Sequence, residues 1–181
     1  MTFDSFHDPT HLYFITATIC GWRPLFANEH YASIVLGSLE WLRKQKRMLL
    51  FAFVLMPSHL HAIIKPENRT IEEVIQNFAS FTAHTILQQL RKDNATELLA
   101  FFHEQKRDAR HQHSIWQDVQ AKNIYSEEFL EQKIEYIHQN PIHQDKNLHR
   151  RADYKYSSAC FYDDGKMPVI EIDDVREYLQ P

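Results

Sequence analysis

Two histidines one residue apart, His59 and His61, have a spacing that suits metal binding. The apolar run at residues 49–55 predicts a strand buried on both faces, and Met-Pro-Ser at 56–58 breaks it. Residues 59–65 then predict a second, antiparallel strand. Because side chains alternate along a strand, both imidazoles point to one face, roughly 7 Å apart at about 3.3 Å per residue. Two such imidazoles can bind one metal ion. The alternative is a pair of half-exposed histidines in a chain that has 12.

A tyrosine and an asparagine on a distant segment offer complementary groups. Tyr136 and Asn140 lie four residues apart on a helix predicted at residues 126–140, so they share one face. That face lies beside the apolar stripe of the helix, where a tyrosine can keep its hydroxyl at the rim of a cleft. The alternatives are an ordinary boundary tyrosine and an asparagine that ends the helix before Pro141.

These four side chains suit one kind of chemistry. A divalent ion held by two imidazoles and an amide oxygen keeps open positions, and it can bind a phosphodiester oxygen. A tyrosine hydroxyl, with an ordinary pKa near 10, is a poor nucleophile until a metal or a base favours the phenolate. Attack on phosphorus would form a covalent phosphotyrosine, which conserves the bond energy for rejoining.

Length and composition indicate one globular domain. The chain has 181 residues, of which 44% are hydrophobic and 13% aromatic. We expect a single domain over residues 1–181, with a core at about 10–142 and a C-terminal tail at about 143–181. Only 3 glycines are present, and no Gly-rich phosphate-binding motif occurs.

The cysteines and the hydropathy of the sequence bear on the cellular location of the protein. Cys20 and Cys160 have no CxxC spacing, which favours a reduced, cytoplasmic environment. The first residues have neither a basic region nor an apolar region of the signal-peptide type. No run of 18 apolar residues occurs, so we expect no membrane span.

The net charge of −4 disfavours nucleic-acid binding unless the basic residues are clustered. One cluster, residues 43–47, ends a helix predicted at residues 29–46. It either complements the helix dipole or contacts phosphates. A second cluster, residues 106–113, predicts a solvated loop, with a flexible nucleic-acid arm as the alternative.

The order of the predicted elements indicates the fold class. We expect strands at 12–20, 49–55, 59–65 and 114–118, helices at 29–46, 70–92 and 126–140, and shorter helical stretches at 95–102 and 173–179. A strand-helix-strand-strand-helix-strand order is typical of an α+β, ferredoxin-like split βαβ sandwich. The sheet would be antiparallel, with helices on one face and a C-terminal catalytic helix.

Five short motifs occur in a fixed order along nearly the whole chain. They are Tyr13-Phe-Ile-Thr16 through Phe26, Leu55-Met-Pro-Ser-His-Leu-His61, Trp116-Gln117, Tyr136-Ile-His-Gln-Asn-Pro141 and Asp153-Tyr-Lys-Tyr-Ser-Ser158. In this the sequence resembles the HUH single-strand DNA transposases with one catalytic tyrosine, in particular the REP-associated tyrosine transposases. Ser58 stands where that family often has Asn.

The resemblance implies a metal-dependent DNA strand transferase. It implies Mg²⁺ or Mn²⁺ on His59 and His61, with Asn140 as third ligand. Tyr136 would cleave single-stranded DNA beside a hairpin, leaving a 5′-phosphotyrosine and a free 3′-OH. Residues suggested for contacts with the DNA backbone are Arg43, Lys44, Lys46, Arg47, Lys146, Arg150 and Arg151.

Two alternatives and the oligomeric state stay open at this stage. The chain could be a domesticated regulator that binds hairpin nucleic acid without turnover. It could also be a metal-dependent phosphodiester hydrolase that uses a water nucleophile. Related enzymes occur as dimers and as monomers with extra C-terminal residues, and the long tail after Asn140 favours a monomer over a homodimer.

Overall fold

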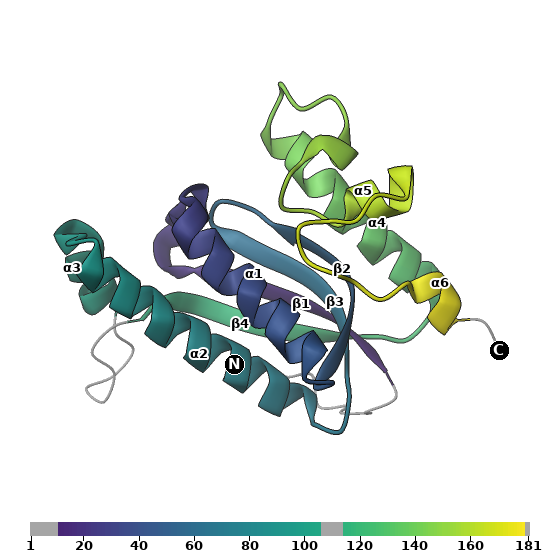
Figure 1. Cartoon of the computed structure of the whole chain (residues 1–181), viewed down its shortest axis with the longest axis horizontal. Helices are drawn as coiled ribbons and strands as arrows, with labels where there is room; N and C mark the ends of the chain where they lie inside the picture. The colour runs from purple at the N-terminus through teal and green to yellow at the C-terminus, as the bar shows by residue number, and fades with distance from the viewer. Residues whose placement is uncertain (1–10, 106–113, 180–181) are drawn as a thin grey trace.

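Four strands form one antiparallel sheet in the order β2-β3-β1-β4. The structure is a computed structural model that describes residues 11–105 and 114–179 (Figure 1). The strands are β1 (Leu12–Ile19), β2 (Met48–Leu55), β3 (His59–Pro66) and β4 (Trp116–Ile124). This strand order is the one expected for a split βαβ fold, so the predicted fold class is confirmed.

The strand register places the two histidines beside β1. His61 pairs with Thr16 and His59 pairs with Thr18, so both imidazoles lie on one face of the sheet. On its other edge β1 pairs with β4 along the full length of both strands. The fourth strand is therefore longer than the predicted 114–118, because its alternating polar and apolar residues extend to Ile124.

Six α-helices complete the described part of the chain. They are α1 (Glu29–Lys44), α2 (Ile71–Lys92), α3 (Thr96–Glu104), α4 (Glu127–Gln144), α5 (Ala159–Asp164) and α6 (Val175–Tyr178). Side chains cap four of them: Asn28 at α1, Thr70 at α2, Ser126 at α4 and Asp174 at α6. Thr70 also forms a capping box with Glu73.

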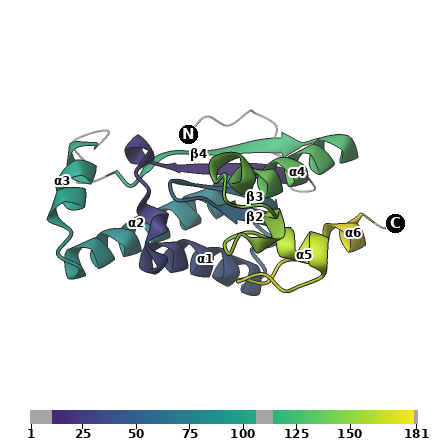
Figure 2. The ribbon, with the colours of Figure 1, turned by 90° about the horizontal axis from the view of Figure 1, so that it is seen from above.

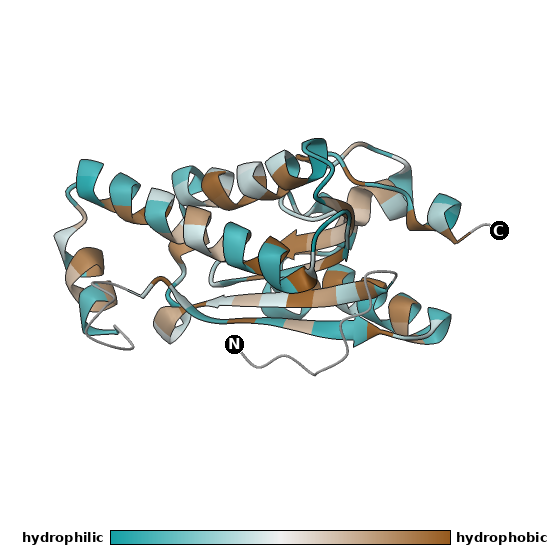
Figure 3. Cartoon of the chain, turned by 90° about the horizontal axis from the view of Figure 1, so that it is seen from below, coloured by the Kyte–Doolittle hydropathy of each residue, from teal (hydrophilic) through white to brown (hydrophobic). Residues whose placement is uncertain are grey.

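Helices cover both faces of the sheet. Helices α1 and α2 lie over one face and enclose the larger hydrophobic core, while α4 packs on the opposite face over a second core around Phe14, Phe51 and Ile137. In Figure 1, α4 and α5 lie at the upper right of the view and α6 lies below them at the right-hand side, and Figure 2 shows the same elements from above. Hydrophobic and hydrophilic bands alternate along α1 and α2, as Figure 3 shows.

Helix α4 does not end before Pro141, and the predicted boundary at Asn140 is wrong. The helix continues through Pro141 to Gln144, and the backbone N–H of Asp145 donates to the carbonyl of Pro141 at 2.9 Å. Proline removes one helical hydrogen bond but tolerates a helical φ, and here the ring is buried. The extra turn places Gln144 above Asn140 on the same face.

The tail after α4 runs along the outer edge of β2. The backbone N–H of Leu55 donates to Tyr156 at 2.8 Å, and that of Ser158 donates to Phe53 at 3.0 Å. Further along, the N–H of Asp173 donates to the carbonyl of Leu50 at 2.7 Å. The tail therefore covers an edge strand that would otherwise be open to pairing.

Two further sequence expectations concern the C-terminal end of the chain and residues 106–113. The short helix expected near 173–179 is present as α6. The loop or arm expected at residues 106–113 lies outside the described residues. Within residues 11–105 and 114–179, no helix is long and apolar enough to cross a membrane.

Candidate active site

A cleft of about 610 Å³ lies where α4 crosses the sheet. Its walls come from β1, β3, β4, α4 and the turn that follows β1. The lining residues are Phe14, Thr16, Thr18, Trp22, His59, His61, Gln117, Asp118, Gln120, Lys122, Lys133, Tyr136, Asn140 and Gln144. Polar and titratable groups dominate this list, which is unusual for a surface formed against a sheet.

The two histidines lie side by side on the floor of the cleft. Their ring centroids are 4.9 Å apart, and both side chains are buried. Each Nδ1 has a hydroxyl partner, Thr16 Oγ1 at 3.0 Å from His61 and Ser58 Oγ at 3.2 Å from His59. The other ring nitrogen of His61, Nε2, faces the hydroxyl of Tyr136.

Burial keeps both imidazoles uncharged near neutral pH. Burial, reinforced by the neighbouring His59, lowers the pKa of His61 to about 3. Burial also lowers the pKa of His59, although a hydrogen bond with the Asn140 side chain opposes this shift. A neutral imidazole has the free lone pair that metal binding requires.

The structure brings Tyr136 to the ring of His61 and Asn140 to the ring of His59. The Tyr136 hydroxyl lies 3.5 Å from His61 Nε2, and the tyrosine side chain is 47% exposed at the mouth of the cleft. Asn140 is buried, and its Oδ1 accepts a hydrogen bond from Gln144 Nε2 at 3.1 Å. Four residues from two distant parts of the sequence therefore share one cleft.

The donor set can be tested against a divalent ion. Among the described residues, no group of three or more His, Cys, Asp or Glu side chains could hold a metal. The candidate set is instead two neutral imidazoles and one amide oxygen, and hydroxyls already orient both rings. This second layer is typical of metal-binding histidines, so His59, His61 and Asn140 fit such an ion.

Two lysines at the cleft were missed in the sequence. The ammonium of Lys133 lies over the rings of Phe14 at 4.9 Å and Tyr136 at 5.5 Å. Burial and the nearby Lys122 lower its pKa, and no described carboxylate forms a salt bridge with it. Its place three residues before Tyr136, hence on the same helix face, was the available signal.

The basic residues suggested for DNA contacts lie elsewhere. None of the seven is among the described residues that line the cleft. Four of them form ion pairs: Arg43 with Glu171 and Asp173, Lys44 with Glu40, Arg150 with Asp164, and Arg151 with Asp163 and Glu135. Arg47 lies over the ring of Trp41. A role in DNA binding stays a prediction for all seven.

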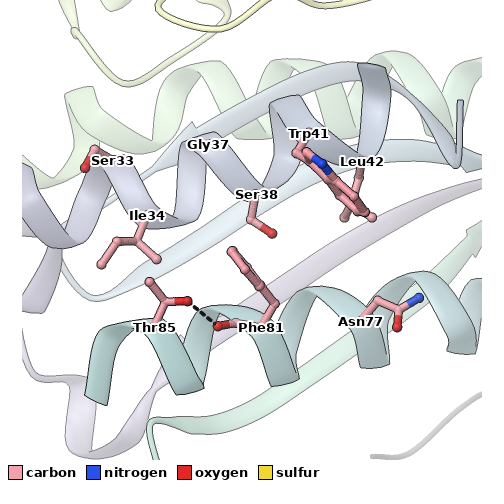
Figure 4. Close-up of a pocket in the computed structure, with 9 residues that line it drawn as sticks. All are labelled: Ser33, Ile34, Gly37, Ser38, Trp41, Leu42, Asn77, Phe81 and Thr85. Carbon is pink, nitrogen blue, oxygen red and sulfur yellow. Dashed lines mark hydrogen bonds between the residues drawn. The ribbon is translucent and has the colours of Figure 1, made fainter. Parts of the chain in front are cut away.

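A second hollow, of about 630 Å³, lies between α1 and α2 (Figure 4). Its lining is mostly apolar, with Ile34, Trp41 and Phe81 among the side chains drawn in the figure. It is separated from the histidine cleft by the sheet, since α1 and α2 cover the opposite face.

Comparison with known proteins addresses the architecture. No protein-family model and no curated protein sequence matches the chain. Among solved structures, it is similar to a REP-associated tyrosine transposase bound to a REP hairpin, with a TM-score of 0.65 and 15% identity. That alignment covers 97% of this chain and 93% of the other. The chain has the fold of a REP-associated tyrosine transposase.

A further solved structure is also similar. It is a putative transposase from Deinococcus radiodurans R1, with a TM-score of 0.44 and 16% identity, covering 73% of this chain and 89% of that chain. The likeness to the REP-associated transposase extends over the sheet, α4 and the tail, because it leaves only a small part of this chain unmatched. The fold thus agrees with the resemblance that the sequence motifs indicate.

Proposed function

We propose that this protein cleaves and rejoins single-stranded DNA through Tyr136. The observation that carries the proposal is the contact of an exposed tyrosine with a buried pair of uncharged imidazoles, its hydroxyl lying 3.5 Å from His61 Nε2. A nucleophile at the mouth of an open cleft suits a long, flexible substrate. Cleavage by a covalent route is reversible, which suits strand transfer better than simple hydrolysis.

The bond changes can be written for one phosphodiester. The Tyr136 oxygen attacks phosphorus and loses its proton to water, the bond from phosphorus to the 3′-oxygen breaks, and that oxygen takes up a proton from water and leaves as a 3′-OH. The 5′-phosphate remains esterified to Tyr136. His59, His61 and Asn140 would hold Mg²⁺ or Mn²⁺, whose charge offsets the negative charge that builds on the phosphoryl oxygens. Lys133 offers a further positive charge over the ring of Tyr136.

The proposed substrate is single-stranded DNA that carries a hairpin. The similar REP-associated transposase was solved bound to a REP hairpin. This chain has a net charge of −4, but Lys122 and Lys133 place cations in the cleft itself. Positive charge is therefore local to the site where a phosphodiester would react.

Covalent capture tests the proposal directly. The wild-type protein, with Mn²⁺ or Mg²⁺, is incubated with labelled single strands from both flanks of its own coding region, and the products are separated on a denaturing gel. We expect a protein adduct on the 5′ end of the cleaved fragment. Tyr136→Phe should abolish the adduct while hairpin binding survives. Tyr125→Phe removes the hydroxyl of another exposed tyrosine outside the cleft and should retain activity.

Other outcomes would replace the proposal. Cleavage without any attached protein would indicate a hydrolase with a water nucleophile. Hairpin binding with no cleavage by the wild-type protein would indicate a regulator. Persistent adduct formation by Tyr136→Phe would mean that another residue is the nucleophile.

A further inference from the structure

An exposed tryptophan lies at the end of the cleft beside His59. The Trp22 side chain is 59% exposed, and its ring meets the His59 ring edge to face, with centroids 5.4 Å apart. Its backbone φ is +54°, which a bulky side chain rarely adopts. A bulky residue at such a φ strains the backbone, and strained residues cluster at ligand-binding and active sites.

The turn that carries Trp22 is held in place from two sides. The preceding Gly21 has φ +62°, and its N–H donates to Gln117 Oε1 at 3.2 Å. A Cβ at Gly21 would lie 2.7 Å from the ring of Phe101, so the turn fits closely against α3. Arg23 lies over the same ring at 4.3 Å. The exposed Trp22 ring is therefore presented by an anchored turn.

The cleft has two chemically different ends. Trp22 and His59 lie at the end where β1 reaches Thr18, while Lys122 lies opposite Phe14, four residues back along β1. That separation is about 13 Å at about 3.3 Å per residue. Lys133 lies over Phe14 at the same end as Lys122. An aromatic surface at one end and two cations at the other match the bases and phosphates of a single strand.

We propose that Trp22 is a stacking platform for the base of a nucleotide next to the scissile phosphate of single-stranded DNA. The position relative to the scissile phosphate rests on the proposed function of Tyr136. The strand would run along the cleft, with one base on Trp22 and a phosphate towards Lys122 and Lys133. Stacking needs only the flat face of a base, so this contact holds the strand without reading much sequence.

Equilibrium binding in a non-cleaving background tests the contact. In Tyr136→Phe protein, Trp22→Ala should weaken binding of a 12-nucleotide unstructured DNA by about 5- to 100-fold, the range expected for one base on one aromatic ring. Trp22→Phe should recover most of the affinity. The matched control is Trp41→Ala, because Trp41 is 49% exposed but lines the other hollow (Figure 4), and it should leave binding unchanged.

An abasic scan identifies the partner base. Single abasic nucleotides are placed at each position of a DNA that carries the cleavage site. At one position, or at two adjacent positions, loss of the base should weaken binding to the Tyr136→Phe parent, which retains Trp22, as much as Trp22→Ala does. Combining the abasic nucleotide with Trp22→Ala should weaken binding no further. Equal affinity of Trp22→Ala and its parent, or no position that couples to Trp22, would overturn the proposal.

Fluorescence covers the case in which Trp22→Ala does not fold. In a Trp41→Phe, Tyr136→Phe protein, the remaining tryptophans are Trp22 and the buried Trp116. Stacking predicts that DNA quenches the emission, and unchanged emission at saturating DNA would contradict it. Because no arm involves cleavage, these results separate failure of the stacking contact from failure of the Tyr136 chemistry.

Discussion

Two hydroxyl side chains determine which nitrogens the histidines offer to the cleft. Ser58 and Thr16 bond the Nδ1 atoms of His59 and His61, so the Nε2 side of His61 remains for Tyr136 or a metal ion. The hydroxyls also hold the ring planes before any ligand arrives, which reduces the entropy lost on binding. Ser58 thus has a defined contact here, with Nδ1 of His59.

Metal binding should be visible as thermal stabilisation without any DNA. An ion at about 100 times its dissociation constant stabilises the folded state by about 2.7 kcal/mol. For a chain of this size that corresponds to a rise in Tm of about 5 to 10 °C. We expect Mn²⁺ to raise the Tm of the wild-type protein and EDTA to reverse the rise, measured by differential scanning calorimetry.

Histidine variants locate the ion. His59→Gln and His61→Gln should each remove the Mn²⁺-dependent rise in Tm. His84→Gln alters an exposed histidine on α2 and should keep it. An equal rise in all four proteins would place the ion away from the cleft.

At the residue scale the sequence indicated four side chains that meet in the cleft but not their surroundings. His59, His61, Asn140 and Tyr136 could be found because alternation in a strand and the helical repeat fix which side chains share a face. Lys122, Gln144 and Trp22 could not, because their places depend on how β4, the last turn of α4 and the turn after β1 meet in space. Such contacts between distant elements leave little trace in local patterns.

At the scale of elements, the tail completes the sheet edge. Asp173 accepts a hydrogen bond from the N–H of Leu50 at 2.9 Å, and it also binds Arg43 at the end of α1. One carboxylate therefore connects the tail, β2 and α1. This explains why Arg43, expected as a DNA contact, is only partly exposed.

Removal of this carboxylate should destabilise the fold more than removal of a neighbouring one. Asp173→Ala leaves the Leu50 N–H without its side-chain acceptor and Arg43 without one of its two carboxylates, which costs about 1 to 3 kcal/mol. Glu171→Ala removes a more exposed partner of Arg43 and should cost about 1 kcal/mol or less. Urea denaturation of both variants gives the two values. A loss for Glu171→Ala equal to that for Asp173→Ala would contradict the role of the Leu50 contact.

The elements were predicted well where one periodicity dominates and poorly where local rules compete. The capped helix α2 and the apolar strand β2 matched their sequence patterns. Pro141 was expected to stop α4, but tertiary packing around the buried proline outweighed its local preference. Strand β4 was predicted too short because its polar residues face the cleft and resemble a loop.

At the scale of the whole molecule, Arg151 joins α4 to the tail through two carboxylates. It pairs with Glu135 on α4 and Asp163 on α5, and it lowers the pKa of Asp163 most strongly. The pKa of Glu135 is also lowered, by Gln139 first and then Arg151. The buried His138 between them bonds Ser158, and burial lowers its pKa to about 4.

The stability of the fold should therefore fall in acid, and Arg151 should account for part of the dependence of Tm on pH. Carboxylates with a lowered folded pKa stabilise the protein above their unfolded pKa, and this contribution is lost as pH falls through the folded pKa. His138 is uncharged in the folded protein because burial lowers its pKa. As the pH falls below the ordinary pKa of histidine, the unfolded chain takes up a proton there, so His138 also lowers the stability in acid. Arg151→Gln should lower Tm at pH 7, and the difference from wild type should shrink towards pH 3. A constant difference across Tm measurements from pH 3 to 7 would refute this.

The cleft offers the proposed chemistry a single nucleophile. Tyr136 is the one tyrosine among the described residues that line it. Under the proposed chemistry, one molecule can thus hold only one severed DNA end at a time. Exchange between two ends then requires either successive visits to the same molecule or the meeting of two molecules on one DNA. The number of nucleophilic tyrosines per cleft, more than the shape of the fold, would limit how many DNA strands one molecule can cleave and exchange in a single binding event.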